Sequence, residues 1–118
     1  MKDYSVIKGE KSVSVCLYCE NQRLLDIGQK MEAICPEAYM NGYNWAAFFR
    51  YYLGIAAPEL LDGLEDDPEA GMYCAYYPLT PENERKAERF GQMVGGLIEN
   101  EERIYRLLRE HGDEIEWD

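Results

Sequence analysis

Four cysteines and one histidine are the side chains of this sequence best suited to nucleophilic catalysis or metal binding. Cys16 and Cys19 form a C-x-x-C pair, but the segment around them alternates like a β-strand, which directs their side chains to opposite faces. A zinc site needs four converging ligands, and His111 is remote in sequence from both cysteines. Because nothing in the sequence indicates secretion, we predict that these two thiols, with Cys35 and Cys74, are reduced and hold no metal.

Other motifs of catalysis are missing from the sequence. The histidine has no evident serine or cysteine partner, so no nucleophile activated by a base is recognisable. The chain carries no glycine-rich phosphate loop, dinucleotide fingerprint or H-E-x-x-H motif. The acidic turn at 65–69 lacks the spaced oxygen ligands of an EF-hand loop. We therefore predict no catalytic residues, no metal, no cofactor and no enzymatic activity.

The charge balance is strongly acidic. Asp and Glu number 23 against 12 Lys and Arg, which gives a formal net charge of −11 and a pI near 4.5. Such a surface repels nucleic acid and speeds the encounter with a basic partner, although solubility alone is the alternative explanation. No apolar run approaches the ~18 residues of a membrane span, and the opening residues Met1–Tyr4 do not begin a signal peptide. We expect a soluble, cytoplasmic protein that does not bind membranes.

The segment from Asn44 to Gly54 is the strongest helix candidate. Asn44 is the predicted N-cap, and Gly54 is the predicted C-terminal stop. A single helical stripe carries its large apolar side chains, which are Trp45, Phe48, Phe49, Tyr52 and Leu53. We predict that this stripe is buried core, in preference to a surface on which a ligand stacks.

Period-two alternation predicts the strands. Asp3–Ile7 and Ser12–Glu20 are expected to form a hairpin, and Met72–Tyr77 is expected to add a further strand. Glu114–Asp118 alternates again, which predicts an edge strand.

The other helices are predicted from caps and prolines. One short helix is expected from Asp26 to just before Pro36, and a second over Pro58–Leu64. Thr80 caps the longest predicted helix, which runs to about His111. The apolar face of this helix is interrupted by three glycines, Gly91, Gly95 and Gly96. At these positions we predict a close approach of another backbone or a kink. Together these elements predict an α+β fold, in which a small, mostly antiparallel sheet packs against the aromatic-rich helix and the long C-terminal helix. We predict one domain over residues 1–118.

Three blocks of sequence resemble the Immunity protein 51 family. They are Asn41-Gly42-Tyr43-Asn44-Trp45 with the helix that ends Arg50-Tyr51-Tyr52-Leu53, then Ala57-Pro58-Glu59-Leu60, then Asp67-Pro68-Glu69-Ala70-Gly71-Met72-Tyr73-Cys74-Ala75-Tyr76. The resemblance covers residues 24 to 108, and its structural motif residues are Asn41, Gly42, Tyr43, Trp45, Pro68 and Gly71. Asn44 stands where the family pattern favours aspartate, an exchange that we interpret as harmless because either residue caps a helix.

The resemblance implies a small α+β protein that binds and neutralises a cognate toxin domain of a bacterial polymorphic toxin system. Two carboxylate clusters are the candidate partner-binding residues, and we expect one of them to face a basic cleft on the toxin. The turn cluster is Asp62, Glu65, Asp66, Asp67 and Glu69, and the tail cluster is Asp113, Glu114, Glu116 and Asp118. The alternative is a small-molecule-binding protein or enzyme with a tyrosine-lined pocket between the aromatic helix and the sheet. No oligomeric state is predicted.

Overall fold

The computed structural model describes residues 3–118, so Met1 and Lys2, which belong to the signal-peptide and domain predictions, lie outside the described residues. The strands are β1 (Tyr4–Lys8), β2 (Ser12–Tyr18), β3 (Glu65–Asp66) and β4 (Met72–Pro78). The helices are α1 (Gln22–Ile34), α2 (Gly42–Ala56), α3 (Pro81–Glu99) and α4 (Glu102–His111), with 3₁₀ helices at Pro58–Leu61 and Gly112–Glu114. The predicted α+β fold is confirmed.

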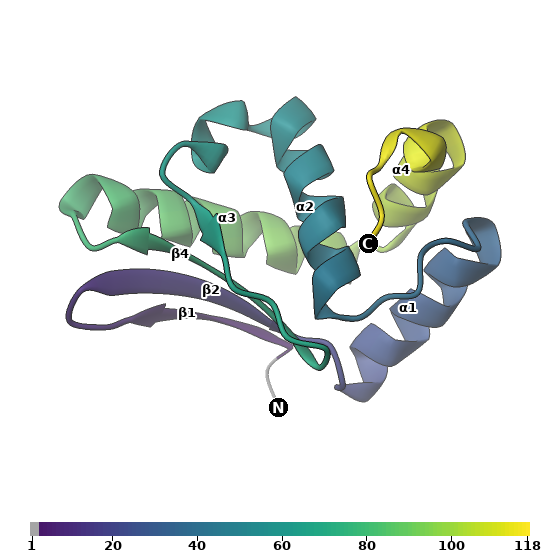
Figure 1. Cartoon of the computed structure of the whole chain (residues 1–118), viewed down its shortest axis with the longest axis horizontal. Coiled ribbons are helices and arrows are strands. Elements are labelled where there is room, and N and C mark those ends of the chain that lie inside the picture. Colours follow the sequence, from purple (N-terminus) through teal and green to yellow (C-terminus); the bar gives the residue numbers. More distant parts are fainter. Residues whose placement is uncertain (1–2) are drawn as a thin grey trace.

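The sheet is antiparallel in the order β1-β2-β4-β3, and α2 and α3 lie on one of its faces (Figure 1). Val15 of β2 lies opposite Ala75 of β4, and the alternate residues on each strand share this face. The buried residues of the face are Val13, Val15, Leu17, Tyr73, Ala75 and Tyr77. The predicted hairpin and the strand before Pro78 are therefore confirmed, with ends that differ from the predicted ones by one or two residues.

The predicted ends of α2 are wrong. Asn41 is the N-cap, and its side-chain oxygen accepts a hydrogen bond from the backbone N–H of Asn44 at 3.0 Å. Asn44 therefore lies inside the first turn, where it cannot cap the helix. The helix also continues past Gly54 to Ala56, and Gly54 does not adopt the positive φ of a left-handed C-terminal stop.

The aromatic stripe of α2 is core, as predicted. Trp45, Phe48, Phe49 and Leu53 are buried, and Tyr52 is half-buried. The ring of Phe49 lies 5.1 Å from that of Tyr73 in β4 and 5.5 Å from that of Phe90 in α3, measured between centroids. These rings fill the space between α2, β4 and α3. The alternative function, small-molecule binding or catalysis in a tyrosine-lined pocket, requires a pocket in this region.

Gly42, the first residue of α2, brings two of the family-like sequence blocks into contact. Its N–H donates to the carbonyl of Ala70 at 3.0 Å. A Cβ at this position would collide with the backbone carbonyl oxygens of Glu69 and Met72. The spacing of the blocks is therefore explained by a contact that only glycine permits.

We expect Gly42→Ala to lower the free energy of unfolding by about 1–3 kcal/mol, because backbone atoms must move to admit the methyl group. Gly54→Ala is the matched control on the same helix, since a Cβ there would meet no atom within 4 Å. That control should be neutral or stabilising. Urea unfolding of both variants measures the difference. Equal changes in the free energy of unfolding would refute the requirement for glycine at position 42.

Two short helices differ from prediction. The first, α1, begins at Gln22, one turn before the predicted Asp26, and buries Leu24, Ile27 and Met31. Leu24 extends the apolar face toward the N-terminus, so the earlier start buries more apolar surface. The second, predicted over Pro58–Leu64, is limited to a 3₁₀ helix over Pro58–Leu61, and Gly63 after it has a φ of 80° that ends helical structure.

The long C-terminal helix is two helices. Thr80 caps α3 as predicted, but the backbone leaves the helical region at Asn100, and α4 then packs against α1. One unbroken helix over residues 81–111 would be roughly 46 Å long, whereas the longest extent of the molecule is 40 Å. The break lets Ile104, Tyr105 and Leu108 reach the core. Among the described residues, no helix is both long and apolar enough to cross a membrane.

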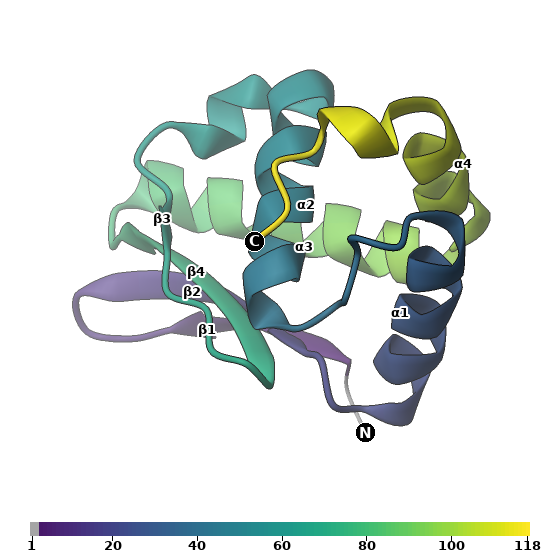
Figure 2. The same ribbon diagram turned by 45° about the vertical axis from the view of Figure 1, so that its right-hand side comes forward.

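The C-terminal segment is not an edge strand. After the 3₁₀ helix Gly112–Glu114 it has no regular structure and crosses the outer side of α2 (Figure 2). Ile115 is buried and Trp117 is half-buried. The alternation that predicted a strand reflects apolar side chains packing onto helices instead of a sheet.

The prediction that all four cysteines are reduced is wrong for two of them. Cys16 in β2 and Cys74 in β4 form a disulfide between directly opposed residues, on the sheet face that points away from α2 and α3. Cys19 and Cys35 are free. Burial raises the pKa of the Cys19 thiol to about 11, so at neutral pH it stays protonated and weakly nucleophilic.

Candidate partner-binding surface

The first two members of the turn cluster, Asp62 and Glu65, contact residues outside α2. Asp62 follows the 3₁₀ helix Pro58–Leu61, and its carboxylate lies 4.0 Å from Lys86 of α3. Glu65 accepts a hydrogen bond from the Tyr76 hydroxyl at 2.9 Å. This hydrogen bond and the carboxylate charge raise the pKa of Tyr76. The Glu65 carboxylate is thus engaged within the protein, whereas the Asp62 side chain remains 92% exposed.

The rest of the turn cluster is placed beside α2. Asp66 forms an ion pair with Arg50 of α2, with 2.7 Å between Oδ2 and Nε. Asp67 and Glu69 are exposed on either side of Pro68. The contact of Gly42 with residues 69–72 fixes this turn against the start of α2.

The tail cluster is held against the same helix by a buried amide. Asn44 is only 3% exposed, and its side chain donates to the carbonyl of Tyr39 at 2.9 Å. The same side chain accepts from the backbone N–H of Asp118 at 2.7 Å. An aspartate here could accept but could not donate while ionised. The interpretation of Asn44 as an interchangeable cap is therefore wrong.

A groove runs along the outer side of α2 between the turn and the tail. Tyr43, Ala47, Arg50 and Tyr51 form its floor, at spacings that place them on one helical stripe. Its two adjoining hollows, of about 310 Å³ and 270 Å³, share Ala47, Arg50 and Glu116. The walls of this α2 groove are Pro68 on the turn side and Glu114, Glu116, Trp117 and Asp118 on the tail side. The structure thus places the tail carboxylates opposite Pro68, the residue between the turn carboxylates Asp67 and Glu69.

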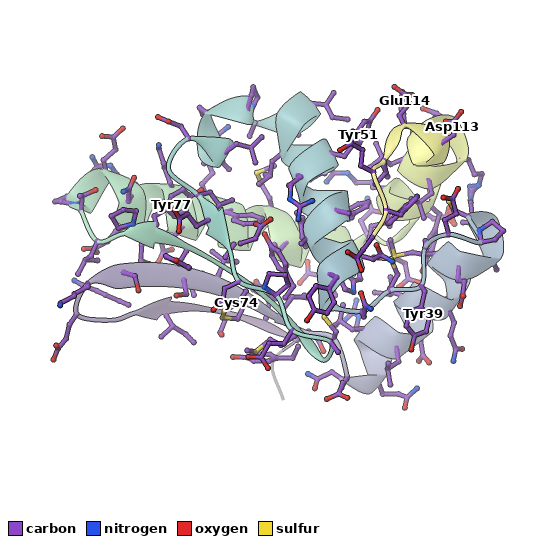
Figure 3. The ribbon with its side chains drawn as sticks, in the orientation of Figure 1. Tyr39, Tyr51, Cys74, Tyr77, Asp113 and Glu114 are labelled. Atoms are coloured by element: carbon purple, nitrogen blue, oxygen red, sulfur yellow. A yellow bond between two sulfur atoms is a disulfide. The ribbon has the colours of Figure 1, made fainter. Side chains whose placement is uncertain are left out.

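Glu114 is anchored at the tail side of the α2 groove. The Oε2 atom of Glu114 lies 2.7 Å from Nδ1 of His111, and this hydrogen bond lowers the pKa of Glu114. Partial burial raises the pKa of Tyr51, and the nearby carboxylates of Glu114 and Asp113 raise it further. Figure 3 shows Tyr51, Asp113 and Glu114 close together where the chain leaves α4.

Four carboxylates around the α2 groove have no ion-pair partner among residues 3–118. These are Asp67 and Glu69 on the turn and Glu116 and Asp118 on the tail. The single cation of the floor, Arg50, is already paired with Asp66. The surface is therefore negative, and its free charges are available to a cationic partner.

Aromatic side chains are also exposed here. Tyr43 is 41% exposed in the α2 groove, and Tyr39, just before α2, is 67% exposed. Tyrosine and tryptophan are enriched among the residues that dominate binding energy at protein interfaces. Sequence reasoning missed Arg50, Tyr51 and Trp117 as groove residues. The one available signal was that Arg50 is the only charged residue of α2.

The arrangement is suited to binding a cationic surface. Within residues 3–118, no three His, Cys, Asp or Glu side chains are grouped as a metal site. His111 is paired with Glu114, and its ring lies 6.0 Å from that of Tyr51. A groove with free carboxylates and exposed aromatic rings can contact Lys and Arg side chains by ion pairs and cation–π interactions.

Comparison with known proteins gives one match. Residues 4–113 match the family model described as Immunity protein 51. No curated protein and no solved structure matches the chain. The matched range includes all of β1 and β2, which the sequence blocks did not reach, and it ends before Glu114.

Proposed function

Because the chain belongs to the Immunity protein 51 family, we propose that it binds a cognate toxin domain of a bacterial polymorphic toxin system and neutralises it by direct contact. In this proposal residues 1–118 act as one domain in the cytoplasm of the producing cell. The mechanism needs no catalysis, cofactor, nucleic acid or membrane. Neutralisation follows from occupying the toxin surface that its substrate would otherwise reach.

The observation that carries the proposal is the α2 groove. Its tail wall places the free carboxylates of Glu116 and Asp118 beside Tyr43 and Trp117, in a chain whose net charge is −11. On its turn side, Asp67 and Glu69 flank the lining residue Pro68. A toxin with a basic cleft is the complementary partner. Charges at the rim of such an interface chiefly raise the association rate, whereas aromatic side chains buried at its centre slow dissociation.

We expect replacement of the carboxylates beside the α2 groove by uncharged amides to slow association with the toxin. Asp66→Asn, Asp67→Asn and Glu69→Gln change the turn, and Glu114→Gln, Glu116→Gln and Asp118→Asn change the tail. Each triple variant should reduce the association rate about tenfold at low salt and flatten its salt dependence. The measurement is surface plasmon resonance with the toxin domain encoded beside this chain, at low and high salt.

The control must change net charge without changing the α2 groove. Glu82, Glu88 and Glu99 are exposed on α3, so their replacement by glutamine removes the same three charges elsewhere. This variant should keep most of the association rate. If all three triple variants behave alike, the groove is not the binding surface. If the native chain and the toxin domain neither co-purify nor associate, the proposed function itself is wrong.

A further inference from the structure

A separate hollow, of about 450 Å³, lies where α2, α3 and α4 meet. Tyr52 lines it from α2, Arg89, Gln92 and Gly96 from α3, and Arg103 from α4. Tyr52 follows Tyr43 by about two and a half helical turns, so this junction hollow lies on the side of α2 opposite the α2 groove.

The polar groups of the junction hollow are mostly hydrogen-bond donors. Arg103 Nη2 donates to the Tyr52 hydroxyl at 3.3 Å, and Arg89 Nη1 donates to Glu59 at 2.8 Å. Each guanidinium has five N–H donors, so both arginines keep unused ones. Arg103 has no carboxylate partner among residues 3–118. No Asp or Glu lines the hollow, although the chain as a whole is strongly acidic.

Gly96 provides an independent observation. The other two glycines of α3 are explained by packing, because a Cβ on Gly91 would meet Val6 and one on Gly95 would meet Tyr4. Side chains of β1, and not another backbone, therefore make the predicted close approach. A Cβ on Gly96 would meet no atom within 4 Å, so packing does not require glycine there. Glycine is unfavourable inside a helix. At Gly96 it keeps the wall of the junction hollow open.

We propose that the junction hollow binds a small oxyanion, either a phosphate or a carboxylate group. Arg103 supplies the principal guanidinium, and Arg89, whose charge is paired with Glu59, supplies its remaining N–H donors from the opposite helix. The planar fork of arginine matches both kinds of oxyanion through paired N–H donors. The Gln92 amide and the Tyr52 hydroxyl add neutral donors beside them. The open space at Gly96 admits the ligand, and this site lies apart from the surface proposed to contact the toxin.

The test is an NMR titration of the full chain with sodium phosphate and, separately, with sodium acetate, each against sodium chloride at equal ionic strength. The side-chain Nε–Hε signals of Arg89 and Arg103 and the backbone amide of Gly96 are followed. Saturable shifts with phosphate, acetate or both, beyond those with chloride, are expected. The anion that binds with the higher affinity, phosphate or acetate, identifies the oxyanion class.

Three variants separate binding from folding. Arg103→Gln should weaken the affinity about tenfold, since it removes charge-assisted hydrogen bonds. Arg106→Gln, exposed on the same helix and outside the lining, should leave the affinity unchanged. Gly96→Ala should weaken binding while its melting temperature holds or rises. Shifts no larger than those with chloride, or equal affinities of the two arginine variants, would overturn the site. No toxin is used, so the result is independent of the proposed function.

Discussion

Removal of the Cys16–Cys74 disulfide is expected to lower the free energy of unfolding by about 4 kcal/mol. The two cysteines are separated by 58 residues, and the bond closes this long loop in the unfolded chain. Without the bond, the unfolded state regains the entropy of an open loop, while the native β2–β4 pairing keeps its hydrogen bonds. A loss of this size is a large part of the stability of an ordinary domain.

The measurement compares urea unfolding of the native chain with and without a phosphine reductant. The double variant Cys16→Ala, Cys74→Ala should match the reduced native chain and should not respond to the reductant. Cys35→Ser is the matched control, because Cys35 is free and half-buried, and it should respond to the reductant as the native chain does. If the reductant leaves the unfolding midpoint of the native chain unchanged, the disulfide does not contribute as argued.

Local patterns predicted the parts of the fold that depend on nearby residues. The alternation of β2 and β4 indicated correctly which residues face the core, and Thr80 indicated the start of α3. The disulfide was missed because its residues meet only through the β2–β4 register. The break at Asn100 was missed because Leu97 and Ile104 are seven residues apart, a spacing that keeps both on one helical face. The polar run at residues 99–103 was therefore interpreted as the exposed side of one continuous helix.

For the candidate surface too, features that depend on nearby residues were predicted, and features that depend on long-range contacts were missed. The acidic residues of both clusters were visible in the sequence, but their position on two sides of one groove was not. That position depends on Gly42 fixing the turn and on Asn44 holding the tail, two contacts across long sequence separations. The tail was predicted as a strand because Ile115 and Trp117 alternate with charged residues, a pattern that does not distinguish sheet packing from packing on a helix.

Trp45→Ala is expected to lower the free energy of unfolding by about 3–5 kcal/mol, because it leaves a large cavity in the core. Trp45 is 2% exposed, and its ring lies 5.8 Å from that of Phe48 and 5.7 Å from that of Phe49. No neighbouring side chain can fill the space without disturbing these contacts. Melting curves and urea unfolding of the variant measure the loss, and a curve equal to that of the native chain would refute the core role.

Trp45→Phe separates the packing of this residue from its polar group. Within residues 3–118, the Trp45 indole N–H has no hydrogen-bond partner, so in the native state it loses water without compensation. Phenylalanine removes this N–H and retains an aromatic ring. Trp45→Phe should therefore lower the free energy of unfolding by only about 1 kcal/mol. Tyr43→Ala, two residues earlier and 41% exposed, should change stability by less than about 0.5 kcal/mol. It should still weaken toxin binding, because Tyr43 lies in the α2 groove. A loss for Trp45→Phe as large as that for Trp45→Ala would contradict the view that an aromatic ring at this position provides most of the stabilisation.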